Sequence, residues 1–198
     1  MGQGIAAVAL TGITKTFPGV VANDDVHLAV RPGEIHAVVG ENGAGKSTLM
    51  KILYGMLRPD RGTIAIDGRE VHFRSPKDAI AAGIGMVHQH FMLADNLTVL
   101  ENVVLGSEPA RAGVLAFEEA RTRIRELSET YGLPLDPDRR VEDLTVGERQ
   151  RVEIIKVLFR GARTLILDEP TAVLVPQEVE ELFRNLRDLA ARGVTIIF

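Results

Sequence analysis

One short segment restricts the fold of this chain more than any other. Residues 40–47 have the sequence Gly-Glu-Asn-Gly-Ala-Gly-Lys-Ser and fit the pattern G-x-x-x-x-G-K-[ST]. They follow a compact apolar strand expected at residues 35–39 and precede a helix expected at residues 46–54. Glycines let such a loop curve so that successive N–H groups point inward, and the helix N-terminus adds its positive end. The segment therefore predicts a phosphate-binding loop between a strand and a helix.

The side chains of this loop indicate a nucleotide and a metal ion. Lys46 can reach the β- and γ-phosphates, and the hydroxyl of Ser47 can bind Mg²⁺. The candidate nucleotide-binding residues are Gly40, Asn42, Gly43, Ala44, Gly45, Lys46, Ser47 and Thr48. The alternative is a glycine-rich turn with a chance lysine, which average composition produces in on the order of 1% of chains of this length. The loop alone is compatible with GTPases, kinases and ATPases.

A second candidate site lies at the end of a later strand. Residues 164–169 are predicted to form a β-strand that ends in two carboxylates, Asp168 and Glu169. Ligands of parallel sheets bind at the carboxyl ends of strands, so Asp168 is placed to hold Mg²⁺, directly or through water. Glu169 is then a candidate to orient or deprotonate an attacking water. The alternative is a solvated acidic turn before Pro170.

Short buried strands alternate with helical patterns along the chain. We expect strands at residues 8–17, 26–30, 165–167 and 194–198, and a hairpin at residues 63–73 around Asp67-Gly68. Helical spacing of apolar residues predicts helices at residues 117–131 and 148–159, and a further helix that begins near Val179 and is ended by Gly193. This order is typical of an α/β fold with a mostly parallel sheet covered on both faces. The stretch at about residues 98–160 is expected to form a helical subdomain.

Composition excludes several classes of function. The 198 residues include no cysteine, which removes disulfides, zinc thiolate sites and cysteine catalysis. The formal net charge of -4 gives no sign of a large basic face, so we expect no nucleic-acid partner. No apolar run approaches the ~20 residues needed to span a bilayer. A role at a membrane would therefore depend on a partner.

Motifs outside the loop separate the nucleotide-binding classes. No guanine-reading Asn-Lys-x-Asp segment occurs, which counts against a GTPase, and a helicase would need a second similar domain. Residues 144–153, Leu-Thr-Val-Gly-Glu-Arg-Gln-Arg-Val-Glu, resemble the signature motif of ABC ATPases, whose usual core is Leu-Ser-Gly-Gly-Gln. With the phosphate loop and the acidic strand in the same order, the chain resembles the ATP-binding domain of ABC transporters over essentially its whole length.

The resemblance implies roles for further residues. In that family the signature motif acts on nucleotide held by the phosphate loop of a partner domain. Thr145 and Gly147 keep its hydroxyl and a glycine, whereas Val146 and Glu148 depart from the usual pattern. Thr145 is also a good helix N-cap in its own right.

Two more positions match the family. Phe17 resembles the aromatic residue that stacks on adenine, although an ordinary core residue at a strand end is the alternative. Gln89 resembles the glutamine that contacts Mg²⁺ or the attacking water and senses the membrane partner. His88 and His90 could be metal ligands on one strand face, but no third ligand is indicated nearby, so we interpret them as flanks of Gln89. The implied cofactors are ATP and Mg²⁺, with Glu169, Lys46 and Gln89 as catalytic residues and Ser47, Gln89 and Asp168 as metal ligands.

The resemblance also implies an assembly. A P-loop NTPase of this type adds an antiparallel β subdomain to the parallel core sheet. A second ATPase domain, in the same polypeptide or in a dimer, is expected to close with the first on two ATP molecules. Transmembrane permease subunits and an extracellular solute-binding protein complete such a system at the cytoplasmic face of the membrane. Residues 88–93, 144–150 and 171–174 look most similar to bacterial sugar and nucleoside importers, especially the nucleoside branch, although the ATPase itself never touches the solute.

The end of the sequence carries one more expectation. ABC ATPases have a histidine just after the final core strand, and this sequence ends at Phe198, within that strand. The loop after the acidic motif also has Val175 where the family commonly has an aspartate. We therefore interpret residues 1–198 as a truncated N-terminal ABC domain that binds Mg·ATP and hydrolyses it poorly.

Other functions share the same motifs. DNA-repair and chromosome ATPases insert a long coiled coil before the signature, and no sustained heptad occurs between Lys46 and Leu144. A ribosome-bound ABC factor would favour a basic linker arm, which the sequence lacks. An ATP-dependent regulatory switch without transport remains a third alternative.

Overall fold

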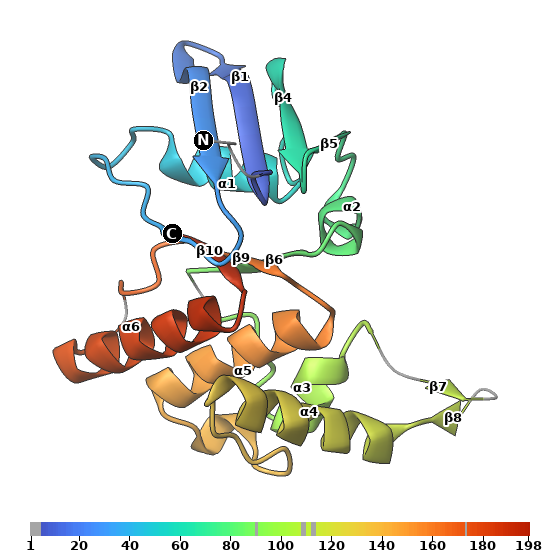
Figure 1. The fold of residues 1–198 in the computed structure, drawn as a ribbon. Helices are drawn as coiled ribbons and strands as arrows, with labels where there is room; N and C mark the ends of the chain where they lie inside the picture. Colours follow the sequence, from blue (N-terminus) through green and yellow to red (C-terminus); the bar gives the residue numbers. More distant parts are fainter. Residues whose placement is uncertain (1–4, 90, 108–109, 112–113, 173) are drawn as a thin grey trace.

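The computed structural model describes residues 5–89, 91–107, 110–111, 114–172 and 174–198. Among these residues, two four-stranded sheets and a group of helices follow one another along the molecule (Figure 1). An antiparallel sheet lies at one end, a parallel sheet lies in the middle, and helices form the other end. The arrangement confirms the predicted α/β class with a parallel core sheet and an antiparallel β part.

The parallel sheet has the strand order β3-β10-β9-β6. Its strands are β3 (Ile35–His36), β6 (Ile84–Val87), β9 (Thr164–Leu167) and β10 (Thr195–Ile197). Successive residues of a strand point to opposite faces, and β9 shows this directly. Leu165 and Leu167 pack among the helices, whereas Ile166 packs toward the antiparallel sheet. The sheet is therefore covered on both faces, which is why its strands are apolar throughout.

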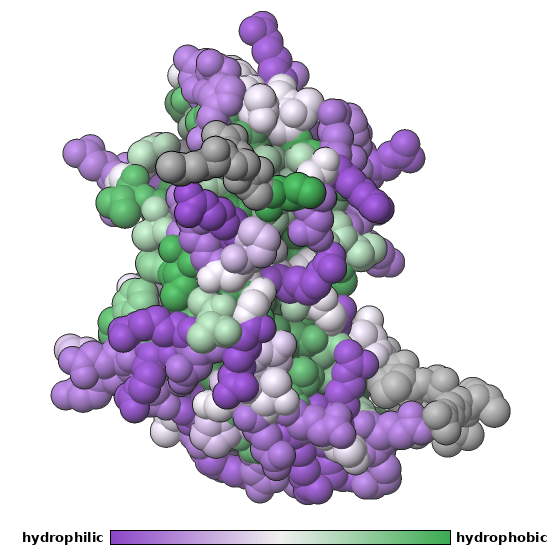
Figure 2. Space-filling model, viewed as in Figure 1, coloured by the Kyte–Doolittle hydropathy of each residue, from purple (hydrophilic) through white to green (hydrophobic). Residues whose placement is uncertain are grey.

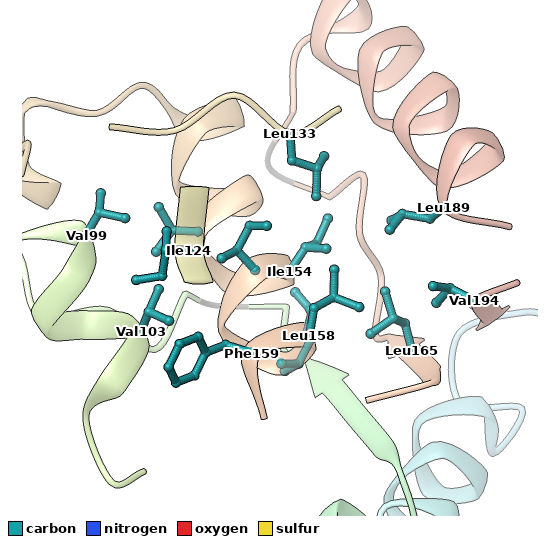
Figure 3. Packing of buried hydrophobic residues seen from close by; sticks show 14 of the residues in the cluster. Val99, Val103, Ile124, Leu133, Ile154, Leu158, Phe159, Leu165, Leu189 and Val194 are labelled. Atoms are coloured by element: carbon teal, nitrogen blue, oxygen red, sulfur yellow. The ribbon is translucent and has the colours of Figure 1, made fainter. Parts of the chain in front are cut away.

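Helices cover one face of the parallel sheet. They are α3 (Val99–Val104), α4 (Phe117–Tyr131), α5 (Val146–Phe159) and α6 (Pro176–Ala191), with a 3₁₀ turn η1 (Val141–Asp143). Figure 3 shows Val103 of α3, Ile124 of α4 and Ile154 of α5 in one apolar cluster. A small hairpin, β7 (Ala110–Arg111) and β8 (Val114–Leu115), which the sequence patterns miss, lies beside α4. The boundary of the helical subdomain stays a prediction.

The antiparallel sheet and α1 (Lys46–Leu53) cover the other face. The sheet has the order β2-β1-β4-β5, formed by β1 (Val8–Phe17), β2 (Val20–Val30), β4 (Arg61–Ile66) and β5 (Arg69–Val71). The hairpin between β4 and β5 turns at Asp67-Gly68, as predicted. A short helix, α2 (Pro76–Ala81), leads into β6. Ile52 and Leu53 share a buried cluster with Leu10 and Ile13 of β1, so α1 is held firmly behind the loop that precedes it.

Some predicted boundaries are wrong for local reasons. The strand expected at residues 35–39 ends at His36, although the N–H of Val38 still donates to the Phe198 carbonyl at 2.6 Å, and Val39 is then 91% exposed. The helix expected from residue 148 begins at Val146, because Thr145 caps it two residues earlier. The strand expected at residues 26–30 extends back to Val20 through pairing with β1.

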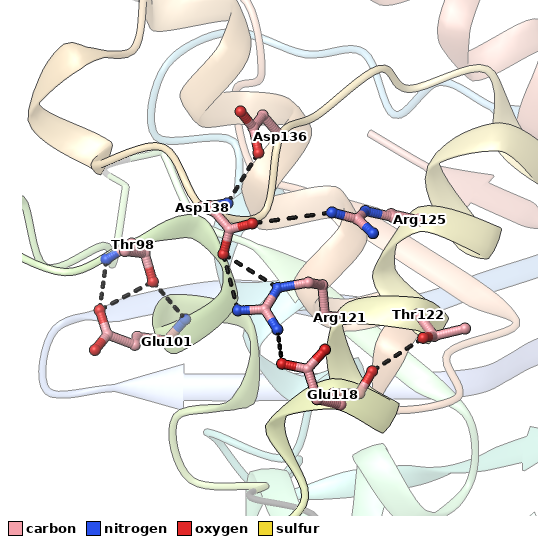
Figure 4. Close-up of polar contacts among 8 residues, drawn as sticks. All are labelled: Thr98, Glu101, Glu118, Arg121, Thr122, Arg125, Asp136 and Asp138. Carbon is pink, nitrogen blue, oxygen red and sulfur yellow. Dashed lines mark hydrogen bonds and ion pairs between the residues drawn. The ribbon is translucent and has the colours of Figure 1, made fainter.

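Polar contacts fix the ends of the helices. Thr98 and Glu101 form a capping box at the start of α3, in which each side chain accepts a hydrogen bond from the other's backbone N–H (Figure 4). Arg121 of α4 contacts Glu118 and donates to Asp138 at 2.9 Å. These contacts tie the loop after α4 to the helices around it.

On the face drawn in Figure 2, the surface is mainly polar at both ends of the molecule. Figure 2 shows hydrophilic side chains over the outer sheet and the outer helices, with more apolar surface between them. In the part of the chain that the structure describes, no helix is both long enough and apolar enough to cross a membrane.

Candidate functional site

The glycine-rich loop has the backbone conformation that its sequence predicts. Gly43 and Gly45 have φ angles of 86° and 88°, which side chains with a Cβ rarely adopt. A Cβ added at Gly45 would lie 2.0 Å from the carbonyl oxygen of Ala22. Asn23 holds the same turn, because its Nδ2 donates to the Gly45 carbonyl at 3.2 Å. Glycine is therefore required at position 45 by both backbone angle and space.

Lys46, the first residue of α1, folds back over the loop. Its Nζ donates to the carbonyl oxygens of Gly40 at 2.6 Å and of Glu41 at 2.9 Å. These carbonyls hold the ammonium on the concave side of the loop. A positive charge thus lies where phosphate oxygens are expected.

Ser47 connects the loop to the acidic strand. Its Oγ donates to Oδ1 of Asp168 at 3.0 Å, although the two residues are far apart in the sequence. Asp168 directly follows β9, and its N–H donates to the carbonyl of Val87 at the end of β6. The structure therefore brings two of the three predicted Mg²⁺ ligands, Ser47 and Asp168, together at the carboxyl edge of the parallel sheet.

Glu169 and Gln89 form a second polar pair at this edge. Nε2 of Gln89 donates to Oε2 of Glu169 at 3.0 Å. Glu169 has a φ of 49°, an uncommon conformation for a residue other than glycine. Such strain is stored where surrounding structure enforces it, and here Asp168 and Pro170 are both fixed by hydrogen bonds. The carboxylate of Glu169 is thereby held beside the amide of Gln89.

The histidines beside Gln89 do not form a metal site in the described part of the chain. His88 packs edge-on against Tyr54, with ring centroids 6.1 Å apart. His90 lies outside the described residues. Among the residues described, no group of three or more His, Asp or Glu side chains could hold a metal ion. The interpretation of His88 and His90 as flanks of Gln89 stays a prediction.

Two hollows meet at the loop. One, of about 410 Å³, is lined by Phe17, Val20, Gly43, Lys46 and Ser47, among other residues. The other, of about 380 Å³, extends from Lys46 past Asp168 and Glu169. Phe17 thus lines the first hollow together with the phosphate loop, and the two carboxylates, Asp168 and Glu169, line the second. Asn42, Lys46 and Glu169 line both hollows.

The signature segment lies elsewhere on the molecule. Thr145 caps α5, because its Oγ1 accepts a hydrogen bond from the N–H of Glu148. The Glu148 carboxylate in turn accepts from the Thr145 N–H, and this hydrogen bond lowers the pKa of Glu148. The N–H of Gly147 donates to Oε1 of Glu178 at 3.2 Å. Neither Thr145 nor Gly147 is among the residues lining the two hollows at the phosphate loop. The structure does not bring these two predicted residues to this chain's own loop.

Sequence reasoning missed several residues that hold the site. Gln150 of α5 is buried and donates to the Pro170 carbonyl at 3.0 Å. Glu153, also buried, accepts from the N–H of Met92 at 2.6 Å, and Lys156 donates to the Met92 carbonyl at 3.0 Å. Burial lowers the pKa of Lys156. The available signal was the position of Gln150 and Glu153 on the apolar face of α5.

The sequence matches one protein-family model over most of its length. The model of the family described as ABC transporter matches residues 23–172. The chain belongs to the ABC transporter family. Its relatives include the guanosine import ATP-binding protein NupO of Bacillus subtilis, 50% identical over 190 residues, and the ribose import ATP-binding protein RbsA 3 of Rubrobacter xylanophilus, 50% identical over 191 residues.

The coverage of these ABC relatives is unequal. Each alignment covers 96% of this chain but only 37% of NupO and 39% of RbsA 3. Among solved structures, cbiO1 from Clostridium perfringens, part of the ABC transporter complex cbiONQ, matches with a TM-score of 0.82 and 30% identity. That match covers 97% of this chain and 77% of the other. The chain thus corresponds in fold to an ABC ATPase domain and spans well under half the length of its import relatives.

Proposed function

We propose that the chain binds and hydrolyses ATP to energise import of a sugar or nucleoside through partner membrane subunits. The observation that carries the proposal is the convergence of two distant segments at one edge of the parallel sheet, with Lys46 and Ser47 from one and Asp168 and Glu169 from the other. Phe17 lines the same hollow as the phosphate loop, at a suitable place for adenine to stack.

Lys46 and Glu169 have opposite charges and act on different groups, Lys46 on the terminal phosphates and Glu169 on the attacking water. Lys46 exchanges its hydrogen bonds to the Gly40 and Glu41 carbonyls for bonds to the terminal phosphates, where its charge stabilises the transition state. Glu169 accepts a hydrogen bond from the attacking water and takes up its proton. The Gln89 amide, which donates to Glu169, keeps that carboxylate in position. Catalysis is then mainly positioning and charge stabilisation.

The residues present fit Mg²⁺. This ion prefers oxygen ligands and usually completes its shell with water and substrate phosphates rather than with protein ligands alone. The hydroxyl of Ser47 and a carboxylate oxygen of Asp168 lie 3.0 Å apart, and Gln89 is the third candidate ligand. When bound, the ion would neutralise charge on the phosphate oxygens.

The signature segment is proposed to act on a second ATPase domain, in the same polypeptide or in a dimer. The N-terminus of α5 offers Thr145 and the Gly147 N–H to an anion, and it lies away from this chain's own loop. A lone domain therefore leaves the γ-phosphate without these donors. We expect slow hydrolysis by the isolated chain and faster hydrolysis when two domains close on ATP.

The import role is supported by the names of its relatives. NupO and RbsA 3 are import ATP-binding proteins for guanosine and ribose. By this likeness, the domain would work at the cytoplasmic face of the membrane with permease subunits and an extracellular solute-binding protein. Nucleoside import is the finer proposal, because the segments 88–93 and 144–150 resemble that branch most.

Uptake in cells tests this proposal directly. Cells carrying the parent gene, or a Lys46→Ala version in its place, are supplied with labelled guanosine or labelled ribose. We expect ATP-dependent uptake of one solute, guanosine by the finer proposal, and its loss in the Lys46→Ala cells. Equal uptake of both solutes by the two strains would contradict the import role.

A further inference from the structure

The end of β1 that carries Phe17 is held by a residue from another strand. The β1–β4 ladder ends at the pair Thr14 and Arg61. Beyond this point Asp60, the residue before β4, continues the pairing with its own groups. Its N–H donates to the Thr14 carbonyl at 2.8 Å, and its Oδ2 accepts from the Thr16 N–H at 2.7 Å. The Asp60 carboxylate thus accepts a backbone hydrogen bond from β1 at a position where β4 no longer pairs with it.

The same carboxylate also holds a lysine beside the aromatic ring. Oδ1 of Asp60 accepts from Nζ of Lys15 at 2.7 Å, and that nitrogen lies 5.6 Å from the centroid of the Phe17 ring. The Lys15 side chain is only 16% exposed. A cation at this distance attracts an aromatic ring. Lys15 and Phe17 are two residues apart on β1 and therefore point to the same face of the sheet.

We propose that Asp60 is a positioning residue for the nucleotide base, because it fixes Lys15 and the backbone at Thr16 and thereby the ring of Phe17. The inference rests on the proposed function, in which adenine stacks on Phe17. A ring already held in its bound position loses less freedom when the base arrives, and binding is tighter for that reason. The hydrogen bond from Lys15 also lowers the pKa of Asp60.

The role of Asp60 concerns the base and not the phosphates. Phe17 lines one hollow and Asp168 lines the other, and the proposed phosphate contacts come from Lys46 and Ser47 at the start of α1. A loss of positioning at Asp60 should weaken binding of ATP and leave binding of inorganic tripolyphosphate unchanged. A general loss of structure would weaken both.

The test compares these two ligands by equilibrium binding in the presence of Mg²⁺. Asp60→Asn should weaken ATP binding roughly two- to fivefold, the range of one exposed cation–π contact, and leave tripolyphosphate binding at the parent value. Lys15→Met should do the same, and Lys15→Arg, which keeps the cation, should stay near the parent. The matched control is Asp67→Asn, which alters an Asp–Arg pair, Asp67 with Arg163, at another turn of the same sheet.

The outcomes separate the positioning role of Asp60 from the proposed function of the chain in ATP binding. If Asp60→Asn and Lys15→Met bind ATP as tightly as the parent, or lose affinity for both ligands equally, the positioning role is wrong while ATP binding stands. If the parent binds neither ligand, or binds both unchanged after Lys46→Ala, the proposed function fails and the Asp60 role fails with it. Circular dichroism confirms folding, and Lys15→Met carries the test if Asp60→Asn does not fold.

Discussion

Glu178 accepts a hydrogen bond from the backbone N–H of Gly147, with 3.2 Å between Oε1 and the nitrogen. Its other oxygen accepts from the N–H of Val175 at 3.1 Å, so one carboxylate connects the N-termini of α5 and α6. In the proposed function, this Gly147 N–H donates to the γ-phosphate held by a second domain. The carboxylate therefore occupies a donor that the phosphate needs and places a negative charge beside it.

Removal of this carboxylate should favour closure of two domains. We expect Glu178→Ala to tighten ATP-dependent association of two chains by roughly fivefold, about 1 kcal/mol, because the donor is freed and like-charge repulsion is removed. The measurement is sedimentation with ATP in a Glu169→Gln background that retains nucleotide. Glu181→Ala, one turn further along α6 and paired with Arg151, is the control. Weaker association after Glu178→Ala would mean that Glu178 supports the signature segment.

Two glycines of the phosphate loop should differ in their tolerance of alanine. Both have positive φ, which costs an alanine about 1–2 kcal/mol. A Cβ at Gly43 meets no atom within 4 Å, whereas one at Gly45 would lie 2.0 Å from the Ala22 carbonyl oxygen. Gly45→Ala should therefore lower the free energy of unfolding by more than about 3 kcal/mol, and Gly43→Ala by only the conformational cost. Urea unfolding of the two variants decides, and equal losses would refute the steric argument.

Asp168 should determine how strongly Mg²⁺ aids nucleotide binding. Asparagine keeps the size of the side chain and an oxygen for Ser47 but loses the charge that attracts the ion. We expect Asp168→Asn to reduce the Mg²⁺-dependent gain in ATP affinity by roughly tenfold and to leave affinity in EDTA unchanged. Titration of ATP with and without Mg²⁺ measures both. Asp188→Asn, exposed on α6, is the control, and an undiminished Mg²⁺ effect in Asp168→Asn would exclude Asp168 as a ligand.

Much of this site could be predicted from local patterns. The backbone conformation of the loop at residues 40–47 could be predicted from the loop itself, because its glycines permit the turn and its lysine begins the helix. Asp168 and Glu169 were expected at a strand end, where parallel strands present their ligands. The meeting of Glu169 with Gln89 follows from the sheet order, in which β9 lies beside β6. The pattern of alternating strands and helices predicted a mostly parallel sheet, but neither its strand order nor the strand β6.

The remaining features depend on contacts between distant segments. Nothing near Asp60 in the sequence indicates that it would reach Lys15 on another strand. The sequence around Glu178 indicates only that it is the third residue of a helix. Its hydrogen bond to Gly147 forms because α5 and α6 pack side by side. The short β7–β8 hairpin has strands of only two residues each, too short to produce an alternating pattern. Such partners become visible only once the fold is known.

Acid should destabilise the fold through its capping carboxylates. The hydrogen bond from the Thr98 N–H lowers the pKa of Glu101 below its usual value of about 4.5, and the hydrogen bond from the Thr145 N–H does the same for Glu148. Between the folded and unfolded pKa values the unfolded chain binds more protons, so this stabilisation is present above about pH 4.5 and is lost as the pH falls through the lowered values.

Substitution of one such carboxylate should reduce this pH dependence. Glu101→Gln should be less stable than the parent at pH 7 and should approach the parent as the pH falls toward 3, because only the parent then loses its charged cap. Urea unfolding between pH 7 and pH 3 provides the comparison. Parallel curves for the two proteins would show that Glu101 does not contribute to the acid response.

Equilibrium binding of ATP to the parent chain and to Lys46→Ala, with and without Mg²⁺, tests the central claim most directly. The account predicts that the parent binds ATP in the micromolar range, more tightly with Mg²⁺, and that Lys46→Ala loses this binding while its circular dichroism stays unchanged. A folded parent chain that does not bind ATP, or a Lys46→Ala variant that binds it as well as the parent, would contradict the account.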